Sequence, residues 1–462
     1  METWAKAEML GANVKDARRR NSLAVILQSL ERQPGSSFSA ATGPAGRQAA
    51  IRLFADETVS VEDLMSGHRS QTCSRIKDEC DGRFVLIVQD TTEFDFTRRK
   101  ATTGLGYINH TLSRGIFAHS ALAITTDGLP LGVMHLEQWT RDDEDYGKSE
   151  NRRNVDITEK ESYRWINTLQ TVEKQLPADQ AALYVQDREA DIFEFLGSPK
   201  CSSSYILVRA AHPRCVEVCD EDDPSKPERT KLFDAVCRAP VLTQMDVTIP
   251  RSKKRPERAA KLTVQVTSVK IMPPAGKKSS KGKAPITAWV IRAFEIDSSD
   301  EERVEWVLIS TYPITDGETA CKFVKYYSIR WIIERLHLTL KTGGCNAEKL
   351  QFDDAHSLKM AIALYYITAW RLLSITYLGR IHPDAPVTRI LDVNELEVLE
   401  AQAKKAILTI SDAIRMIGKL GGHEPYKGGP PAGIKVLWIG LRRLEDMAHG
   451  WMLAKQGIPL FN

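Results

Sequence analysis

The segment Tyr327–Lys341, YSIRWIIERLHLTLK, combines polar residues at helical spacing with many apolar residues. At about 100° per residue, one helix over this segment brings Arg330, Glu334 and Lys341 to within roughly 60° of Tyr327 around its axis. The intervening apolar residues predict that the flanks of this polar stripe are buried; they are Trp331, Ile332, Ile333, Leu336, Leu338 and Leu340. A functional carboxylate is one interpretation of the stripe, and a surface salt-bridge ladder between Arg330 and Glu334 is the plainer one.

Two further acids each follow a short apolar run, FVLIVQD ending at Asp90 and ALYVQD ending at Asp187. Such continuous runs predict strands that are buried on both faces, and hence an α/β fold. Side chains at the carboxyl ends of such strands converge on a crevice. A lone aspartate there is usually a helix cap or turn former, but two of them together with Glu334 form a candidate catalytic group.

The remaining pattern predicts five segments, with boundaries at 1–62, 63–212, 213–303, 304–378 and 379–462. The first is helical and carries Arg18 and Arg19, which suit contact with phosphates, although a solvated helix end is an equal alternative. The second contains the Asp90 and Asp187 strands, a hairpin over 115–139 that turns at Asp127-Gly128, and a helix over 158–176.

The third segment predicts an antiparallel β insertion with basic loops, RSKKRPERAAK and KKSSKGK. These loops suit a phosphate backbone or are solvated hairpin tips. The fourth segment begins with the strand VEWVLISTYP and contains the Tyr327–Lys341 helix. Further helices are predicted over 356–378, 393–420 and 434–454.

Composition narrows the class of protein. The chain has 462 residues, a formal net charge of +3 and eight cysteines. Its N-terminus lacks a secretory pattern and its longest apolar run, 360–370, is too short to span a bilayer, so we expect a cytoplasmic protein with reduced thiols and no membrane partner. A zinc site is disfavoured because the spacing of the available ligands is not that of paired C-x2-C motifs; these ligands are His212, Cys215, Cys219 and Cys237.

Three carboxylates without a catalytic His or Cys group suit Mg²⁺, with Mn²⁺ as a substitute. Two such ions about 4 Å apart promote phosphoryl displacement. Asp90 would bridge both ions, and Asp187 and Glu334 would each complete one. The basic residues of the stripe, with Tyr327, would hold phosphodiester oxygens, which predicts a polyanionic substrate.

Four motifs carry a resemblance to a known family. They are DTT at Asp90, DREADI at Asp187, VRAAHPR at Arg209, and Y-x2-R-x3-E-x6-K from Tyr327 to Lys341. Shorter pieces include HS at His119 and KESYRW at Lys160. Together, in this order, they resemble bacterial cut-and-paste transposases of the insertion-sequence-four family.

The resemblance implies an RNase H-like catalytic core interrupted by a β-rich insertion, an N-terminal DNA-binding domain and a C-terminal helical dimerisation region. It implies that Asp90, Asp187 and Glu334 are catalytic metal ligands and that Tyr327, Arg330 and Lys341 contact phosphates. By similarity, Arg209 contacts end DNA near a hairpin intermediate, and Trp306 stacks on a flipped base or is simply a buried strand residue.

The implied activity is cleavage of double-stranded transposon ends and their joining to target DNA by a synaptic homodimer. End-sequence preference does not transfer, because Ser22 stands where the family has a second arginine after DARR, and Arg20 is an extra base. Two alternatives remain open. They are a catalytically silent, transposase-derived DNA-binding regulator and a nuclease without strand transfer.

Overall fold

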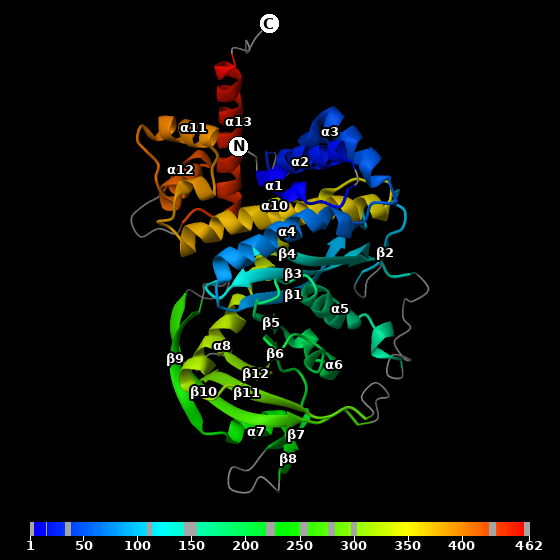
Figure 1. The fold of residues 1–462 in the computed structure, drawn as a ribbon, viewed down its shortest axis with the longest axis vertical. Coiled ribbons are helices and arrows are strands. Elements are labelled where there is room, and N and C mark those ends of the chain that lie inside the picture. Colours follow the sequence, from blue (N-terminus) through cyan, green and yellow to red (C-terminus); the bar gives the residue numbers. More distant parts are fainter. Residues whose placement is uncertain are drawn as a thin grey trace. The chain divides into compact units, whose positions relative to one another are not determined.

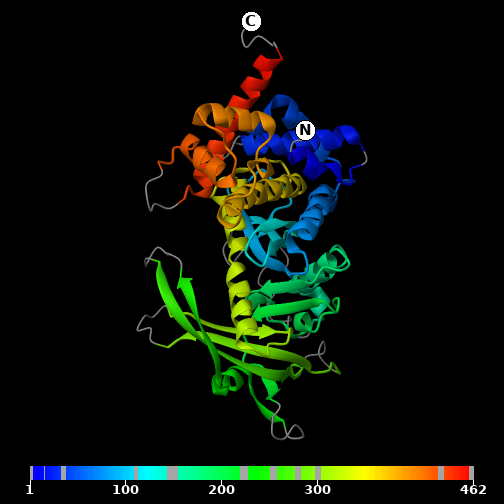
Figure 2. The same cartoon turned by 60° about the vertical axis from the view of Figure 1, so that its left-hand side comes forward.

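The computed structural model describes residues 4–14, 16–32, 38–108, 113–142, 155–218, 227–249, 257–275, 282–296, 303–424 and 431–456. The fold is mixed α/β, with an N-terminal helical region and a large mixed sheet (Figures 1 and 2). The chain divides into two compact units, each assembled from separated segments. The first unit comprises Met1–Asp81, Thr91–Tyr146 and Ile332–Asn462, and the second comprises Gly82–Asp90 and Gly147–Trp331. The five-segment organisation remains a prediction.

The first unit begins with helices α1 (Trp4–Leu10), α2 (Ala17–Arg32), α3 (Phe38–Phe54) and α4 (Val61–Cys80). The carboxylate of Asp16 accepts a hydrogen bond from the backbone N–H of Arg18 at 2.8 Å, as expected of a cap. Helix α3 is kinked at Gly43, where φ is 66°. Helix α4 was missed by the sequence analysis, although Ser60 and Asp63 form a capping box at its start.

The predicted hairpin is confirmed as β3 (Arg114–Thr125) and β4 (Pro130–Trp139), joined through Asp127 and Gly128, and β2 (Gly106–Tyr107) pairs with β3. Helices α4 and α10 (Ala355–Ile381) pack on β4 (Figure 1). Gly132 permits this close approach, because a Cβ there would lie 1.9 Å from Oγ1 of Thr72. Helix α10 is long and apolar enough to cross a membrane, but 89% of its apolar window is buried, which confirms the predicted buried helix.

The rest of the first unit is helical. It contains α9 (Ile332–Lys341), the short 3₁₀ helices η5 (Ala347–Lys349) and η6 (Val387–Arg389), α11 (Val393–Ala403), α12 (Ile410–Leu420) and α13 (Ile434–Lys455). The prediction of one helix over 393–420 was wrong. The chain leaves the helix at Lys404, which has a left-handed φ of 54°, and re-enters a helix at Ile410.

Strand β1 (Val85–Asp95) runs from the second unit into the first. The prediction that this strand ends at Asp90 was wrong, since the strand continues for five residues. Its residues are buried up to Gln89 and then alternate between more and less buried positions. The β-branched Thr91 and Thr92 suit this half-buried continuation.

In the second unit, β1 is parallel to β5 (Ala182–Gln186), and β5 is parallel to β6 (Ser204–Arg209). Antiparallel strands continue the order as β12 (Glu305–Ser310), β11 (Ile286–Glu295), β10 (Arg258–Ile271), β7 (Cys215–Val218) and β8 (Glu228–Lys231), and β9 (Val241–Ile249) also pairs with β10. The β-rich character predicted after residue 213 is therefore confirmed. Most of both predicted basic loops lies outside the described residues.

The helical elements of the second unit are η2 (Ile157–Glu159), α5 (Tyr163–Glu173), η3 (Arg188–Ala190), α6 (Phe193–Leu196), α7 (Leu232–Arg238) and α8 (Gly317–Ile329). The single helix predicted over Tyr327–Lys341 was wrong, because α8 ends at Ile329 and α9 begins at Ile332. At the break, the N–H groups of Arg330 and Trp331 donate to carbonyls three residues back, at 3.1 and 3.4 Å. This tighter turn replaces the α-helical spacing.

Candidate active site and nucleic-acid interface

The two strand acids lie on neighbouring parallel strands of the second unit. The printed register pairs Val88 with Val185. The ladder ends there; if its register continued for two residues, Asp90 would lie opposite Asp187 with both side chains on the same face of the sheet, because side-chain direction repeats every two residues. Parallel neighbours are about 4.8 Å apart. On this register the two carboxylates share one row.

A buried glutamine braces the two strands just before the acids. The Oε1 of Gln186 accepts a hydrogen bond from the backbone N–H of Gln89 at 2.9 Å, and its Nε2 donates to the carbonyl oxygen of Ile87 at 3.2 Å. The side-chain amide thus satisfies two backbone groups where the regular β1–β5 ladder ends. The sequence analysis noted a glutamine before each acid but did not assign it a role.

Asp187 ends β5 as predicted and caps the 3₁₀ helix η3, because its Oδ1 accepts from the N–H of Glu189 at 2.9 Å. The next strand extends the row. Gln186 pairs with Val208 across β5 and β6. The residues that follow this pair are Asp187 and Arg209, so Arg209 is the residue opposite Asp187. Arg209 is also opposite Leu308 of β12. Arg209, a predicted DNA contact, is therefore the third member of the row that contains Asp90 and Asp187.

Trp306 lies two residues before Leu308, so its side chain projects from the same face as that of Arg209. It is half-buried, and its ring packs edge-on against Tyr327 with centroids 5.4 Å apart. The guanidinium of Arg330 lies 5.9 Å from the centre of the Tyr327 ring. Four predicted DNA-contacting residues of the second unit are therefore gathered on and beside β12.

The sequence predicts that the apolar residues of the Tyr327–Lys341 segment are buried, and for two of them this prediction was wrong. Trp331 is 58% exposed and Leu338 is 45% exposed. Trp331 stands at the break between α8 and α9, next to Arg330. An exposed indole at this point is a candidate stacking surface for a base. The sequence analysis did not identify Trp331 as a DNA contact because it expected this side chain to be buried.

Glu334 lies in the first turn of α9 in the first unit and is half-buried. Helix α9 is attached to β3 by His337, whose Nε2 is 3.3 Å from Oγ of Ser120. Burial, with the nearby Lys341, lowers the pKa of His337 to about 3, so the imidazole is neutral. On the adjacent residue of β3, His119, the Nδ1 lies 2.9 Å from Oγ1 of Thr91. Thr91 is the residue that follows Asp90.

Lys341 closes the predicted stripe but has a carboxylate beside it. Its Nζ lies 3.7 Å from Oε1 of Glu348 and 5.8 Å from the centre of the Phe94 ring. The same Glu348 oxygen accepts from the backbone N–H of Asp95 at 3.2 Å. A phosphate reaching Lys341 would therefore compete with Glu348.

The N-terminal arginines lie at the start of α2. Arg18 and Arg19 are both exposed. Arg19 forms an ion pair with Asp56, and hydrogen bonds from Thr58, with the Arg19 contact, lower the pKa of that carboxyl to about 2. Arg18 is accessible to a phosphate on the surface of this helix.

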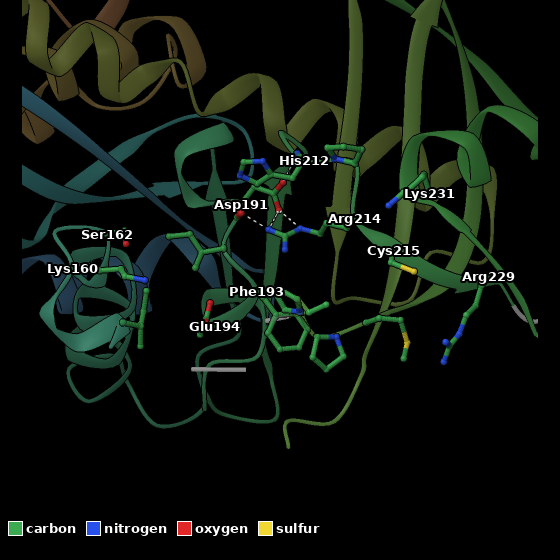
Figure 3. Close-up of a pocket in the computed structure, with 17 residues that line it drawn as sticks. Lys160, Ser162, Asp191, Phe193, Glu194, His212, Arg214, Cys215, Arg229 and Lys231 are labelled. Atoms are coloured by element: carbon green, nitrogen blue, oxygen red, sulfur yellow. Dashed lines mark hydrogen bonds and ion pairs between the residues drawn. The ribbon is translucent and has the colours of Figure 1, made fainter. Parts of the chain in front are cut away.

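A second aspartate of DREADI was missed as a functional residue. Asp191 is buried and accepts hydrogen bonds from the N–H groups of Ala211 (2.8 Å) and His212 (3.0 Å). Arg214 donates to it from Nε at 2.9 Å and from Nη2 at 2.6 Å (Figure 3). One carboxylate thereby ties the DREADI motif to the VRAAHPR motif. The signal was its place in a motif of which only Asp187 had been interpreted.

Among the described residues of either unit, no three His, Cys, Asp or Glu side chains form a ready-made metal group. The disfavoured zinc ligands His212, Cys215 and Cys237 are thus not part of such a group, and Cys219 lies outside the described residues. A carboxylate row such as that of Asp90 and Asp187 offers oxygen donors, which Mg²⁺ and Mn²⁺ prefer.

Residues 1–59 match a family model described as transposase DNA-binding. The matched segment contains α1 to α3 and the exposed arginines of α2. This match supports a transposase that binds DNA, and it agrees with the predicted role of the N-terminal helices.

Proposed function

We propose that this chain is a metal-dependent DNA transposase of the insertion-sequence-four family, with an RNase H-like catalytic core. It binds the inverted repeats at transposon ends, acts as an endonuclease on them and joins the freed 3′-hydroxyls to target DNA. The observation that carries the proposal is the row formed by Asp90, Asp187 and Arg209 in a chain whose N-terminus matches a transposase DNA-binding model.

The proposed metal ligands are Asp90, Asp187 and Glu334. An all-carboxylate set fits Mg²⁺ or Mn²⁺ better than zinc. The strand spacing of about 4.8 Å between the two row acids also suits a pair of ions about 4 Å apart. When bound, two such ions activate the attacking hydroxyl and stabilise the leaving oxygen.

The protein's own residues supply binding and orientation. Arg209, on the row beside Asp187, would pair with a phosphate oxygen flanking the scissile bond, and Arg330 would bind the next. Trp306 or the exposed Trp331 would stack on a base that leaves the helix at the transposon end. Arg18 and Arg19 would hold the duplex away from the chemistry.

Side chains behind the acids would keep them in register. Gln186 fixes β1 to β5, and the Thr91–His119 contact fixes the residue after Asp90 to β3. The neighbouring Ser120–His337 contact holds the helix that carries Glu334. Such positioning matters because misplacement of a reacting group by about 1 Å can cost about 100-fold in rate.

The proposal includes a hairpin intermediate, a synaptic homodimer and a cytoplasmic location. The test is incubation of the purified chain with labelled duplex that carries the candidate ends and flanking DNA, in Mg²⁺, Mn²⁺ or EDTA. We expect metal-dependent nicks at the end boundary, a hairpin on denaturing gels and joined products. Binding without nicks would indicate a regulator, and nicks without joining would indicate a nuclease.

Variants assign the roles. Replacing Asp90, Asp187 or Glu334 by alanine should abolish nicking and leave end binding intact. Replacing Asp179, an exposed aspartate of the second unit, should change neither. Retained cleavage in any of the three variants would remove that residue from the ligand set.

A further inference from the structure

A cavity of about 660 Å³ opens beside η3 in the second unit (Figure 3). Its walls come from residues 157–162, 191–194, 212–215 and 272–275, with Arg229 and Lys231. A volume of this size encloses a small molecule comparable to one or two nucleotides, and it does not admit a duplex. Trp306, Tyr327 and Arg330 do not line it, so it is separate from the cluster beside β12.

The cavity carries an excess of positive charge. Lys160, Arg214, Arg229 and Lys231 line it, against two carboxylates, Asp191 and Glu194. Asp191 is already engaged by Arg214, and Arg229 pairs with Glu217 across β7 and β8. The two lysines stand on opposite sides of the opening (Figure 3). Each lysine offers an ammonium group to an anion on its own side of the cavity.

Most of the remaining wall is apolar, and Ser162, His212 and Cys215 also line it. The apolar part is formed by Ile157, Ile192, Phe193, Pro213, Met272, Pro273 and Pro274. Pro213 is exposed and Pro273 is half-buried, so part of this apolar surface is accessible from the cavity. An apolar wall next to cationic side chains suits a nucleotide, whose base is largely apolar on its faces and whose phosphate is charged.

The cavity adjoins the proposed cleavage site through the chain itself. Asp191 lines it and follows Asp187 by four residues, which span at most about 14 Å. A DNA strand whose scissile phosphate lay at Asp187 would therefore reach the cavity within a short distance. A free mononucleotide has the same chemistry but would have no reason to lie at this position.

We propose that this cavity holds one or two unpaired nucleotides of the DNA strand that passes Asp187, with Lys160 and Lys231 at the phosphates. The inference rests on the proposed function, because it is the cleavage site at Asp187 that brings a strand here. It assigns the surface between the DREADI and VRAAHPR motifs to single-stranded DNA.

The binding test uses fluorescent duplexes, blunt or with a single-stranded thymidine overhang, in EDTA so that no strand is cut. We expect Lys160→Ala combined with Lys231→Ala to weaken binding of the overhang duplex about tenfold. Blunt duplex should lose less than about twofold. The control is Lys174→Ala, which removes an exposed charge of the same unit outside the cavity.

Photocrosslinking locates the strand. With 5-iododeoxyuridine in the overhang, we expect crosslinks on peptides that contain residues 157–162, 191–194, 212–215 or 272–275. Crosslinks elsewhere, or equal overhang affinities for the double variant and Lys174→Ala, would overturn the assignment.

Competition with thymidine monophosphate separates the two sources of a nucleotide. Displacement of the overhang only by oligonucleotides supports the proposal, and displacement by the monophosphate at equal concentration overturns it in favour of a free nucleotide. Because these measurements need no metal, a chain that crosslinks correctly but never nicks would refute the transposase chemistry alone. A chain that nicks but crosslinks elsewhere would refute the cavity assignment alone.

Discussion

Removing the Asp191 carboxylate is the sharpest test of the link between the two motifs. The substitution Asp191→Ala leaves Arg214, whose side chain is only 10% exposed, without its ion-pair partner. It also leaves the N–H groups of Ala211 and His212 without their acceptor. Arg214 keeps only its hydrogen bond to the backbone carbonyl of residue 191 among its contacts with that residue.

The expected cost follows from burial. Removing one member of a buried ion pair costs about 3–5 kcal/mol, because the other charge stays buried. Each orphaned backbone donor costs about 1–3 kcal/mol when water cannot reach it. Water would enter beside Arg214 through the adjoining cavity, so the lower end of the range applies, about 5 kcal/mol in all. Asp191→Asn keeps an acceptor for the backbone and should lose about half as much.

Hydrogen–deuterium exchange is the suitable assay, because global unfolding of a chain with two units need not be two-state. Exchange of peptides covering 204–214 should accelerate by roughly three to four orders of magnitude in Asp191→Ala, since each 1.4 kcal/mol corresponds to about tenfold. The surface control Asp179→Ala should leave exchange unchanged. A loss of protection below about tenfold would refute the account of Asp191 as the tie between the motifs.

Three further predictions concern other parts of the fold. Gly67→Ala should destabilise the first unit by more than about 2 kcal/mol in urea unfolding, because the added Cβ would lie 2.4 Å from the Glu8 carbonyl oxygen. The control is Gly450→Ala, where the Cβ meets open space and should stabilise the helix by about 0.5–1 kcal/mol. Burial, together with nearby Glu445 and Glu395, raises the pKa of Glu31 from 4.5 to about 8. The stability that protonated Glu31 contributes is thus lost as pH rises from about 4.5 to 8. In thermal scans, Glu31→Gln should melt at the same temperature as the wild type at pH 5 and at a higher temperature than the wild type at pH 8.5. Glu57→Gln, at an exposed position, is the control. Gln186→Leu removes the side-chain acceptor of the Gln89 N–H and the side-chain donor to the Ile87 carbonyl. It should reduce nicking about 100-fold while end affinity, measured by gel shift, is retained.

Local pattern was sufficient where the structure is decided locally. The hairpin over 115–139 follows from two apolar runs and a Gly at a turn that needs φ of 100°. Asp187 was placed correctly because a Gln-Asp step after four buried residues ends β5 directly. Helix α4 was missed although its capping box is also local. Its sequence is rich in polar residues and shows little apolar periodicity, which was the signal used to predict helices.

The remaining errors arise from contacts between distant segments. β1 continues past Asp90 because the residues after it pair within the first unit, as the bond from the Phe96 N–H to the Arg114 carbonyl shows. The break at Arg330 coincides with the point where the chain passes between units, which a helical wheel does not reveal. Asp191 owes its role to residues about twenty positions further on.

The contacts among the motifs bear on the choice between an enzyme and a silent DNA-binding regulator. A regulator needs exposed cations, and Arg18 on α2 supplies one. It does not need Thr91 bound to buried His119, Ser120 bound to buried His337, or Gln186 bridging two strands beside an acid. Buried polar groups are costly unless their partners are held in place, and here those partners hold the segments that carry Asp90, Glu334 and Asp187. Such support near each proposed ligand is expected if these carboxylates have to be positioned for chemistry, and it is the reason for which we propose an enzyme and not a regulator.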